Sequence, residues 1–287
     1  DNYLVRALLL LLVALIYNLT VAIRLNDPTF IWAWLILQTL SISLLISYPL
    51  LKFSRVVRLV ISIVLLISNQ FFLWWLIPYK GQPNLFGVLF HILYNPVEHY
   101  VIVPFFSIFL SGTVIGDLIF NSNLINPQKD RRTIFKNKFI FYMILFGFIF
   151  TFIGVLYYFP NFFSYGTYSS IIYAFGITIC LFAVLLTLEK YEIFKTKKSY
   201  TYLYYYSYYS FSIYIVHNLL YFPFVRQLSV ITIWIPVLLM IPLLGLLLKM
   251  IYKHLGMKAS LKTIMSAASY LIVKKIRTKN ASKKKVS

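Results

Sequence analysis

The hydrophobic positions of this chain fall into eight long runs, which short polar or basic segments separate. Each run is about 20 residues long, the length at which an α-helix crosses the hydrocarbon core of a bilayer. The runs do not alternate with a period of two, as the strands of a membrane barrel would. The pattern therefore predicts an all-α, polytopic integral membrane helix bundle of about eight transmembrane helices. The predicted spans are residues 5–23, 30–51, 56–77, 100–120, 139–159, 168–188, 208–225 and 230–252.

Three segments lie outside this pattern. Residues 85–94 are apolar but too short to span, which predicts a re-entrant or interfacial helix inside the long loop from Pro78 to His99. Residues 257–273 place apolar side chains at helical spacing beside lysines, which predicts an amphipathic cytoplasmic helix. Residues 274–285 are polybasic, and we expect them to be disordered and to associate with anionic lipid. The chain thus divides into a transmembrane domain, residues 1–256, and a basic cytoplasmic tail, residues 257–287.

The charges support this topology. Charged residues make up 12% of the chain, about half of what a soluble domain carries. If the N-terminus is cytoplasmic, alternating loops place 24 of the 27 basic residues on the cytoplasmic side, as the positive-inside rule requires. Both ends of the chain are then predicted to be cytoplasmic. Membrane topology accounts for the net charge of +20, so we do not expect nucleic acid as a partner.

His217 lies about halfway along the predicted span 208–225. An ionisable side chain inside a bilayer is costly and is by default a functional-site hypothesis. The alternative, of equal weight, is a histidine that holds the bundle together by a hydrogen bond to a neighbouring helix. Helical spacing places Tyr214, His217 and Tyr221 on one face of this span. We expect that face to point towards protein or water.

A second set of polar residues lies on the predicted outer side. His91, Glu98 and His99 are candidates for proton handling there, with an ordinary solvated loop as the alternative for the two histidines. The histidines lack the spacing of metal ligands on one helix face, so no metal is expected. In the next span, Gly112 and Gly116 form a small-xxx-small pair whose plain interpretation is close helix packing. Asp117 is expected to cap the helix end or to pair with a basic loop residue.

Three stretches of the sequence resemble a known family. The segment Glu98-His-Tyr-Val-Ile-Val-Pro104-Phe-Phe-Ser-Ile-Phe-Leu-Ser-Gly112-Thr-Val-Ile-Gly116 resembles the D-Y-x-P-L-x-P-W … G-x-x-x-G segment of heparan-α-glucosaminide N-acetyltransferase-like membrane proteins. The run Ser210-Phe-Ser-Ile-Tyr214-Ile-Val-His217 resembles the S-Y-S-I-Y-L-x-H signature, which the wider acyltransferase-3 group shares. Residues 30–47 resemble the family helix before the first segment. The first motif proline is Val101 here, and the motif tryptophan is Phe105.

The resemblance implies a membrane acyltransferase that takes an acetyl group from cytosolic acetyl-CoA and delivers it to a sugar amine or hydroxyl on the far side. The resemblance also implies that the family's own catalytic histidine lies in spans before the start of this sequence. Within this chain, His217 and Glu98 are the expected catalytic residues. The expected ligands of the CoA phosphates are Arg131, Arg132, Lys136 and Lys138, although topology alone also accounts for these basic residues. The expected substrate-binding residues are His91, His99, Pro104, Ser212, Tyr214 and Asn218.

Family members also begin with an R-x-x-x-x-D-x-x-R-G box followed by spans with a catalytic histidine, and this sequence contains no such box. The chain starts Asp1-Asn2-Tyr3, so we expect it to be the C-terminal part of a longer protein. Expected partners are the lipid bilayer, a glycan or glycolipid acceptor and, as a candidate assembly, a second copy of the chain. Two other function classes stay open: a transporter or lipid-linked glycan flippase, and a non-catalytic membrane scaffold.

Overall fold

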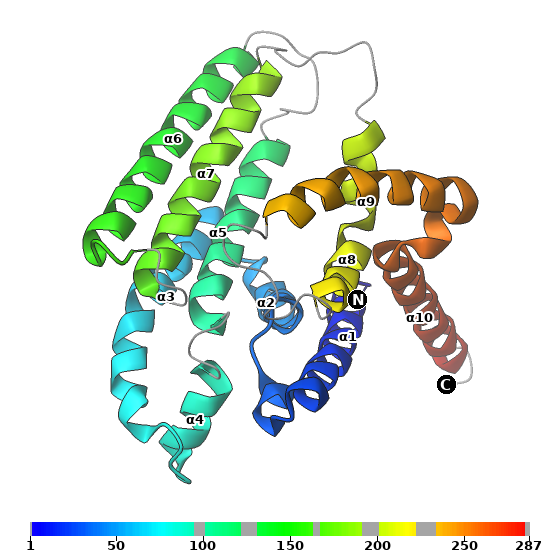
Figure 1. The fold of residues 1–287 in the computed structure, drawn as a ribbon, viewed down its shortest axis with the longest axis horizontal. Helices are drawn as coiled ribbons and strands as arrows, with labels where there is room; N and C mark the ends of the chain where they lie inside the picture. Colours follow the sequence, from blue (N-terminus) through cyan, green and yellow to red (C-terminus); the bar gives the residue numbers. More distant parts are fainter. Residues whose placement is uncertain are drawn as a thin grey trace. The chain divides into compact units, whose positions relative to one another are not determined.

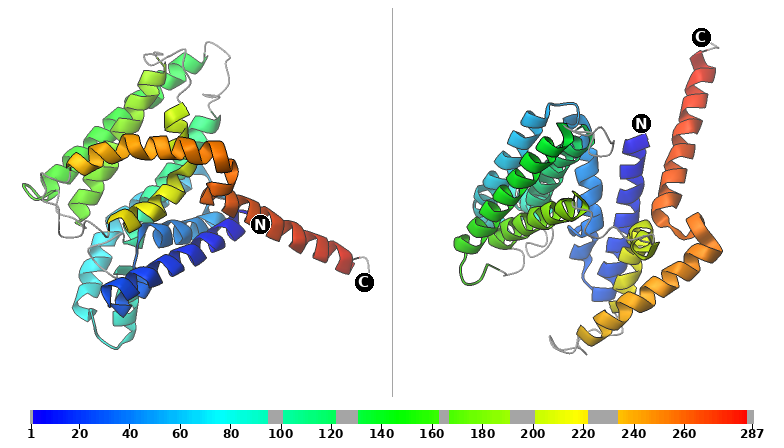
Figure 2. Two further views of the ribbon diagram at one scale, coloured as in Figure 1. Left: turned by 45° about the vertical axis from the view of Figure 1, so that its right-hand side comes forward. Right: turned by 90° about the horizontal axis from the view of Figure 1, so that it is seen from above.

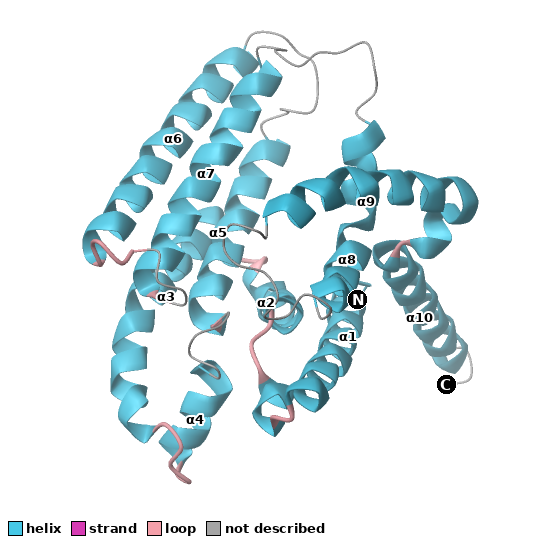
Figure 3. Cartoon of the chain, in the orientation of Figure 1, coloured by secondary structure: helices cyan, strands magenta, loops and turns pink. Residues whose placement is uncertain are grey.

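The computed structural model of the chain describes residues 2–94, 101–121, 131–162, 167–190, 201–221 and 234–284 (Figure 1). The described residues are helical with short connecting turns and contain no strand (Figure 3). The chain divides into two compact units. One consists of residues 10–195, and the other combines residues 1–9 with residues 196–287. This confirms the all-α fold class that the hydrophobic runs predicted.

Seven helical segments of the described chain are long and apolar enough to cross a membrane. They are Asn2–Leu25, Pro28–Leu50, Arg55–Tyr79, Ile102–Phe120, Lys138–Tyr157, Tyr168–Leu188 and Pro236–Leu255. They match seven of the eight predicted spans. The remaining prediction, residues 208–225, overlaps α8 (Thr201–Tyr221), which is not among these seven. The first half of α8 is rich in tyrosine and serine, and this lowers its hydropathy relative to the other spans.

The unit of residues 10–195 contains most of α1 (Asn2–Leu25), then α2 (Ile36–Leu50), α3 (Arg55–Leu76), α4 (Leu85–Tyr94), α5 (Ile102–Asn121), α6 (Arg131–Tyr157) and α7 (Tyr168–Lys190). Local capping explains several of the helix starts. Ser54 Oγ accepts a hydrogen bond of 3.3 Å from the Val57 amide at the start of α3. Asn84 Oδ1 accepts one of 2.7 Å from the Gly87 amide in the first turn of α4. The short α4 is the non-spanning helix that residues 85–94 predicted.

The predicted span 30–51 is not one continuous helix. A 3₁₀ turn (Pro28–Trp32) is followed by extended backbone, and α2 begins only at Ile36. Asp27 caps the 3₁₀ turn, and hydrogen bonds from the Thr29 hydroxyl and amide hold the pKa of its carboxyl below the usual value. The buried Asn18 side chain donates to the Ala33 carbonyl at 2.9 Å. Non-helical backbone at membrane depth persists where protein groups satisfy it, and Asn18 supplies such a group.

Glycines line the contact between α6 and α7. A Cβ atom added at Gly176 of α7 would meet the Thr151 backbone amide and would lie 2.7 Å from the Gly147 carbonyl oxygen. A Cβ at Gly147 would lie 2.6 Å from Cys180 Sγ, and one at Gly154 would lie 2.6 Å from the Tyr173 amide. The two backbones therefore approach each other through small residues, as membrane helices commonly do. In contrast, a Cβ at Gly112 or Gly116 would meet nothing within 4 Å. The close packing expected of that pair is wrong for the described residues, because the tight contact belongs to α6 and α7.

The other unit contains α8, α9 (Trp234–Leu255), a 3₁₀ turn (Gly256–Ala259) and α10 (Leu261–Lys284) (Figure 2). The amphipathic helix predicted from residue 257 is therefore preceded by a turn, with Gly256 at a φ of +51°. The expected disorder from residue 274 onward is wrong for the described residues, because α10 continues to Lys284. Lysine and arginine are good helix formers, and no glycine or proline interrupts residues 261–284.

Candidate functional site

A line of polar side chains runs along the buried contact between α3 and α5. On α3 it contains Arg58, Ser62 and Asn69, which are spaced so that they share one helix face. All three are buried, with exposed fractions of 2–4%. We call this set the α3/α5 polar seam and define it as Arg58, Ser62, Asn69, Ser107, Ser111, Thr113 and Asp117. Polar residues buried between apolar membrane helices are expensive and commonly mark function, so this seam is the candidate site.

Three serines form the centre of the seam. Ser62 Oγ donates to the Ser107 carbonyl at 2.8 Å, and Ser107 Oγ donates to the Ser62 carbonyl at 2.7 Å. Ser62 Oγ and Ser111 Oγ lie 2.5 Å apart. The three hydroxyls thus cross the helix pair in both directions. This network fixes which face of α5 meets α3, and it holds hydroxyl groups in a low-dielectric interior where their dipoles act strongly.

Arg58 occupies one end of the seam. Its guanidinium forms an ion pair with Asp117 of α5, and its Nη1 donates to Thr113 Oγ1 at 2.9 Å. The Arg58 side chain is 4% exposed, whereas the Asp117 side chain is 43% exposed. Asp117 therefore pairs with a basic residue as expected, but that residue lies inside helix α3 and not in a loop. The Nε–H of Arg58 is buried and has no hydrogen-bond partner. One charged donor thus stays unsatisfied inside the helix pair.

The other end of the seam contacts α4. The Tyr94 hydroxyl donates to Asn69 Oδ1 at 3.2 Å, and burial raises the pKa of Tyr94 to about 12. Phe90 and Tyr94 of α4 pack on Leu76 and Val101, which fixes the short helix against α3 and the start of α5. Pro104, a predicted substrate-binding residue, lies on α5 and is fully buried.

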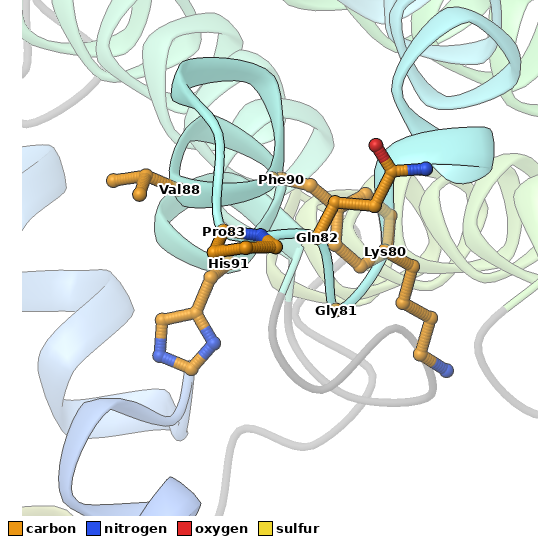
Figure 4. Close-up of a pocket in the computed structure, with 8 residues that line it drawn as sticks. Lys80, Gly81, Gln82, Pro83, Val88, Phe90 and His91 are labelled. Atoms are coloured by element: carbon orange, nitrogen blue, oxygen red, sulfur yellow. The ribbon is translucent and has the colours of Figure 1, made fainter.

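His91 lies on α4 and lines a hollow of about 410 Å³, together with residues 80–83, Gly87, Val88 and Phe90. Its ring is exposed and points away from Lys80, which lies on the other side of the hollow (Figure 4). Gln82 donates to the Pro78 carbonyl and accepts from Asn84, so its amide is engaged within the loop. Glu98 and His99, the other polar candidates of this loop, lie outside the described residues.

The signature on α8 has a different environment. Ser212 Oγ accepts a hydrogen bond of 3.1 Å from the Leu261 amide and donates to the Ala259 carbonyl at 3.3 Å. It therefore connects α8 to the first turn of α10. Tyr214 is partly buried on the same helix. His217 and Asn218 lie in the last turns of α8, and their side chains lie outside the described part of the chain.

The other tyrosines of α8 have structural contacts that the sequence did not indicate. Tyr209 donates to the Gly256 carbonyl at 2.8 Å, and the Tyr208 hydroxyl accepts from Thr263 at 3.1 Å. The rings of Tyr204, Tyr205 and Tyr208 pack around Tyr252 of α9, with centroids 5.1–5.9 Å apart. The tyrosine cluster therefore packs α8 against α9 and the start of α10.

The predicted CoA-binding residues begin α6. Arg131, Arg132 and Lys136 lie in its first turns, where the side chains are outside the described set, and Lys138 is exposed. Among the residues that the structure describes, no three His, Cys, Asp or Glu side chains gather as a metal site would require. Comparison with known protein families, with curated proteins and with solved structures finds no match.

The seam is the feature that sequence reasoning missed. In the sequence, Arg58 is one of the basic residues that membrane topology accounts for, and Ser62 and Asn69 are single polar residues within a predicted span. The signal lay in their common helix face, together with the matching polar stripe of Ser107, Ser111 and Asp117 on α5. Two helices that both carry such a stripe reduce its desolvation cost by placing the stripes together.

Proposed function

We propose that this chain belongs to a membrane acyltransferase that transfers an acetyl group from acetyl-CoA to a sugar amine or hydroxyl across the bilayer. The observation that carries the proposal is the position of the polar seam on α5. This helix bears Pro104, Gly112 and Gly116, the residues that resemble the acetyltransferase segment, and also the buried serines and the partner of Arg58. A segment with that resemblance therefore coincides with one of the buried polar regions of the unit of residues 10–195.

The chemistry needs two kinds of group. When the acceptor nitrogen or oxygen attacks the thioester carbonyl, a new bond to carbon forms, an oxyanion develops and the carbon–sulfur bond then breaks. A base must take the acceptor proton, and the released thiolate of CoA must receive one. His217 and Glu98 are the proposed proton carriers. Buried N–H and O–H donors stabilise an oxyanion in a dry site.

Acetyl transfer from labelled acetyl-CoA to extracted glycans, in membranes of cells that express the natural gene, tests this function. We expect label transfer above membranes that lack the gene, and His217→Gln should reduce it at least about tenfold, a barrier change of about 1.4 kcal/mol. Glutamine keeps hydrogen bonding but cannot take up a proton. His254→Gln, an exposed histidine in the last turn of α9, is the matched control and should keep full turnover.

Other outcomes of these experiments distinguish an acyltransferase from a flippase, and a catalytic histidine from a structural one. A His217→Gln protein with full turnover and a lowered Tm would assign the histidine to the structure of the bundle. Absence of label transfer, combined with gene-dependent movement of a glycolipid across the bilayer, would replace the acyltransferase by a flippase.

We further infer that both ends of the chain lie on the cytoplasmic side, because most basic residues then share that side. Single cysteines at the exposed positions Lys52 and Lys80, in a Cys180→Ala background, test this orientation. An impermeant thiol reagent added to intact cells should label Lys80→Cys and leave Lys52→Cys unlabelled until the cells are opened. The reverse labelling pattern would invert the topology.

A further inference from the structure

We propose that the outward face of α10 binds the anionic headgroup surface of the membrane that the chain spans. This inference does not depend on the acyltransferase proposal. It concerns the unit that contains α8, α9 and α10, in which the membrane-spanning part of α9 ends at Leu255. A single 3₁₀ turn, Gly256–Ala259, separates that end from the start of α10 at Leu261 (Figure 2). The proposal therefore places the start of α10 at the membrane surface. Helix α10 itself is not among the helices apolar enough to cross.

Hydrogen bonds fix which face of α10 turns inward. At its start, Ser212 accepts from the Leu261 amide, and Ser260 donates to the Tyr208 carbonyl at 3.1 Å. In its middle, Ser269 donates to Asn2 Oδ1 at 2.7 Å and accepts from Arg6 Nε at 3.3 Å. Ser269 and Val273 are buried. These anchors hold the helix by its serine face, and the opposite face is left outward.

The outward face changes character along the helix. In the first half it carries Ile264, Tyr270 and Leu271, with exposed fractions of 45%, 59% and 63%. The second half carries the exposed Lys274 and Lys275. The sequence of α10 contains seven basic residues and no acidic one.

This order matches a lipid surface better than a protein partner. Apolar side chains next to the end of a membrane span can enter the boundary between headgroups and acyl chains. Lysine and arginine beyond them reach phosphate groups while their stems cover apolar surface. Because every charged residue of α10 is basic, the helix favours an anionic surface. We therefore commit to anionic phospholipid as the occupant.

The test uses the whole chain in lipid nanodiscs with an environment-sensitive fluorophore on Leu271→Cys, in a Cys180→Ala background. Discs of phosphatidylcholine alone are compared with discs that also contain phosphatidylglycerol. We expect the fluorophore to shift to the blue with phosphatidylglycerol, to be quenched by lipid-borne quenchers and to lose the shift in high salt. The same fluorophore on Lys52→Cys, an exposed loop position between α2 and α3, reports the background response.

Charge-neutral variants make the test specific. The double variant Lys274→Gln, Lys275→Gln should weaken the attraction by roughly 25-fold, at about fivefold per basic residue near such a surface. It should therefore need a higher phosphatidylglycerol fraction for the same shift. A fluorophore that stays open to aqueous quenchers in both lipids would overturn the proposal. Protection that follows protein concentration and ignores lipid charge would also overturn it, in favour of a second copy of the chain.

Discussion

Gly176→Val is expected to lower the free energy of unfolding by at least about 3 kcal/mol, the upper part of the range for overpacking a close-packed contact. A side chain at Gly176 meets backbone atoms, namely the Thr151 amide and the Gly147 carbonyl oxygen. Backbone atoms cannot rotate away as the end of a flexible side chain can. The α6/α7 pair must therefore separate along its length. Titration with a denaturing detergent, followed by tryptophan fluorescence, measures the change.

Gly112→Ala is the matched control, because a Cβ there meets nothing within 4 Å. It replaces a glycine by alanine in a helix interior and should stabilise slightly, by about 0.5–1 kcal/mol. Gly176→Ala makes the same chemical change in the tight contact and should destabilise. Equal effects of the two alanine variants would show that α6 and α7 do not approach through Gly176.

Asp117→Ala is expected to cost about 3 kcal/mol, the lower end of the range for leaving a buried charge without its ion-pair partner, because Arg58 is the buried member of this pair. The substitution leaves the Arg58 guanidinium buried with Thr113 as its remaining partner in the seam. Arg58→Met should cost less, because the half-exposed Asp117 carboxylate can turn to solvent. The same detergent titration gives both values.

The double variant Arg58→Met, Asp117→Leu should recover most of the loss, since apolar pairs of similar volume replace buried ion pairs at little cost. The exposed Arg55, one turn earlier on α3, gives the control Arg55→Met, for which we expect a change within about 0.5 kcal/mol. If Asp117→Ala and Arg55→Met were equally mild, the Arg58 charge would be solvated and the seam would be open at that end.

The hydrophobic pattern alone determined the fold class and seven of the spanning segments. Lipid acts as the solvent, so the length of each apolar run decides whether a helix can cross, and run length is a local property. The same reasoning identified α4 as a short non-spanning helix. It failed at residues 30–35, where the long-range hydrogen bond from Asn18 to Ala33 satisfies a non-helical backbone that hydropathy cannot distinguish from a helix.

The candidate site was predicted less completely. The resemblance predicts Pro104 as a substrate-binding residue. The structure shows that Pro104 is buried on α5, one of the two helices that form the polar seam. Ser212 was selected as a substrate contact, and the structure shows it holding the first turn of α10. The partnership of Arg58 with Asp117 could not be read from the chain, because 59 positions separate them and several basic residues were available to the carboxylate.

Sequence thus determined which segments are long and apolar enough to cross a membrane, how charge is distributed between their loops, and which residue types the proposed chemistry would use. Only the tertiary structure decided which helix faces meet. Glycines in α5 and in α6 and α7 look equally suited to close packing, yet only those of α6 and α7 lie against neighbouring backbone. The length of an apolar run is a property of one segment. Contact between two helix faces depends on two segments at once, and the packing energy that favours one contact over another arises only when both helices are in place.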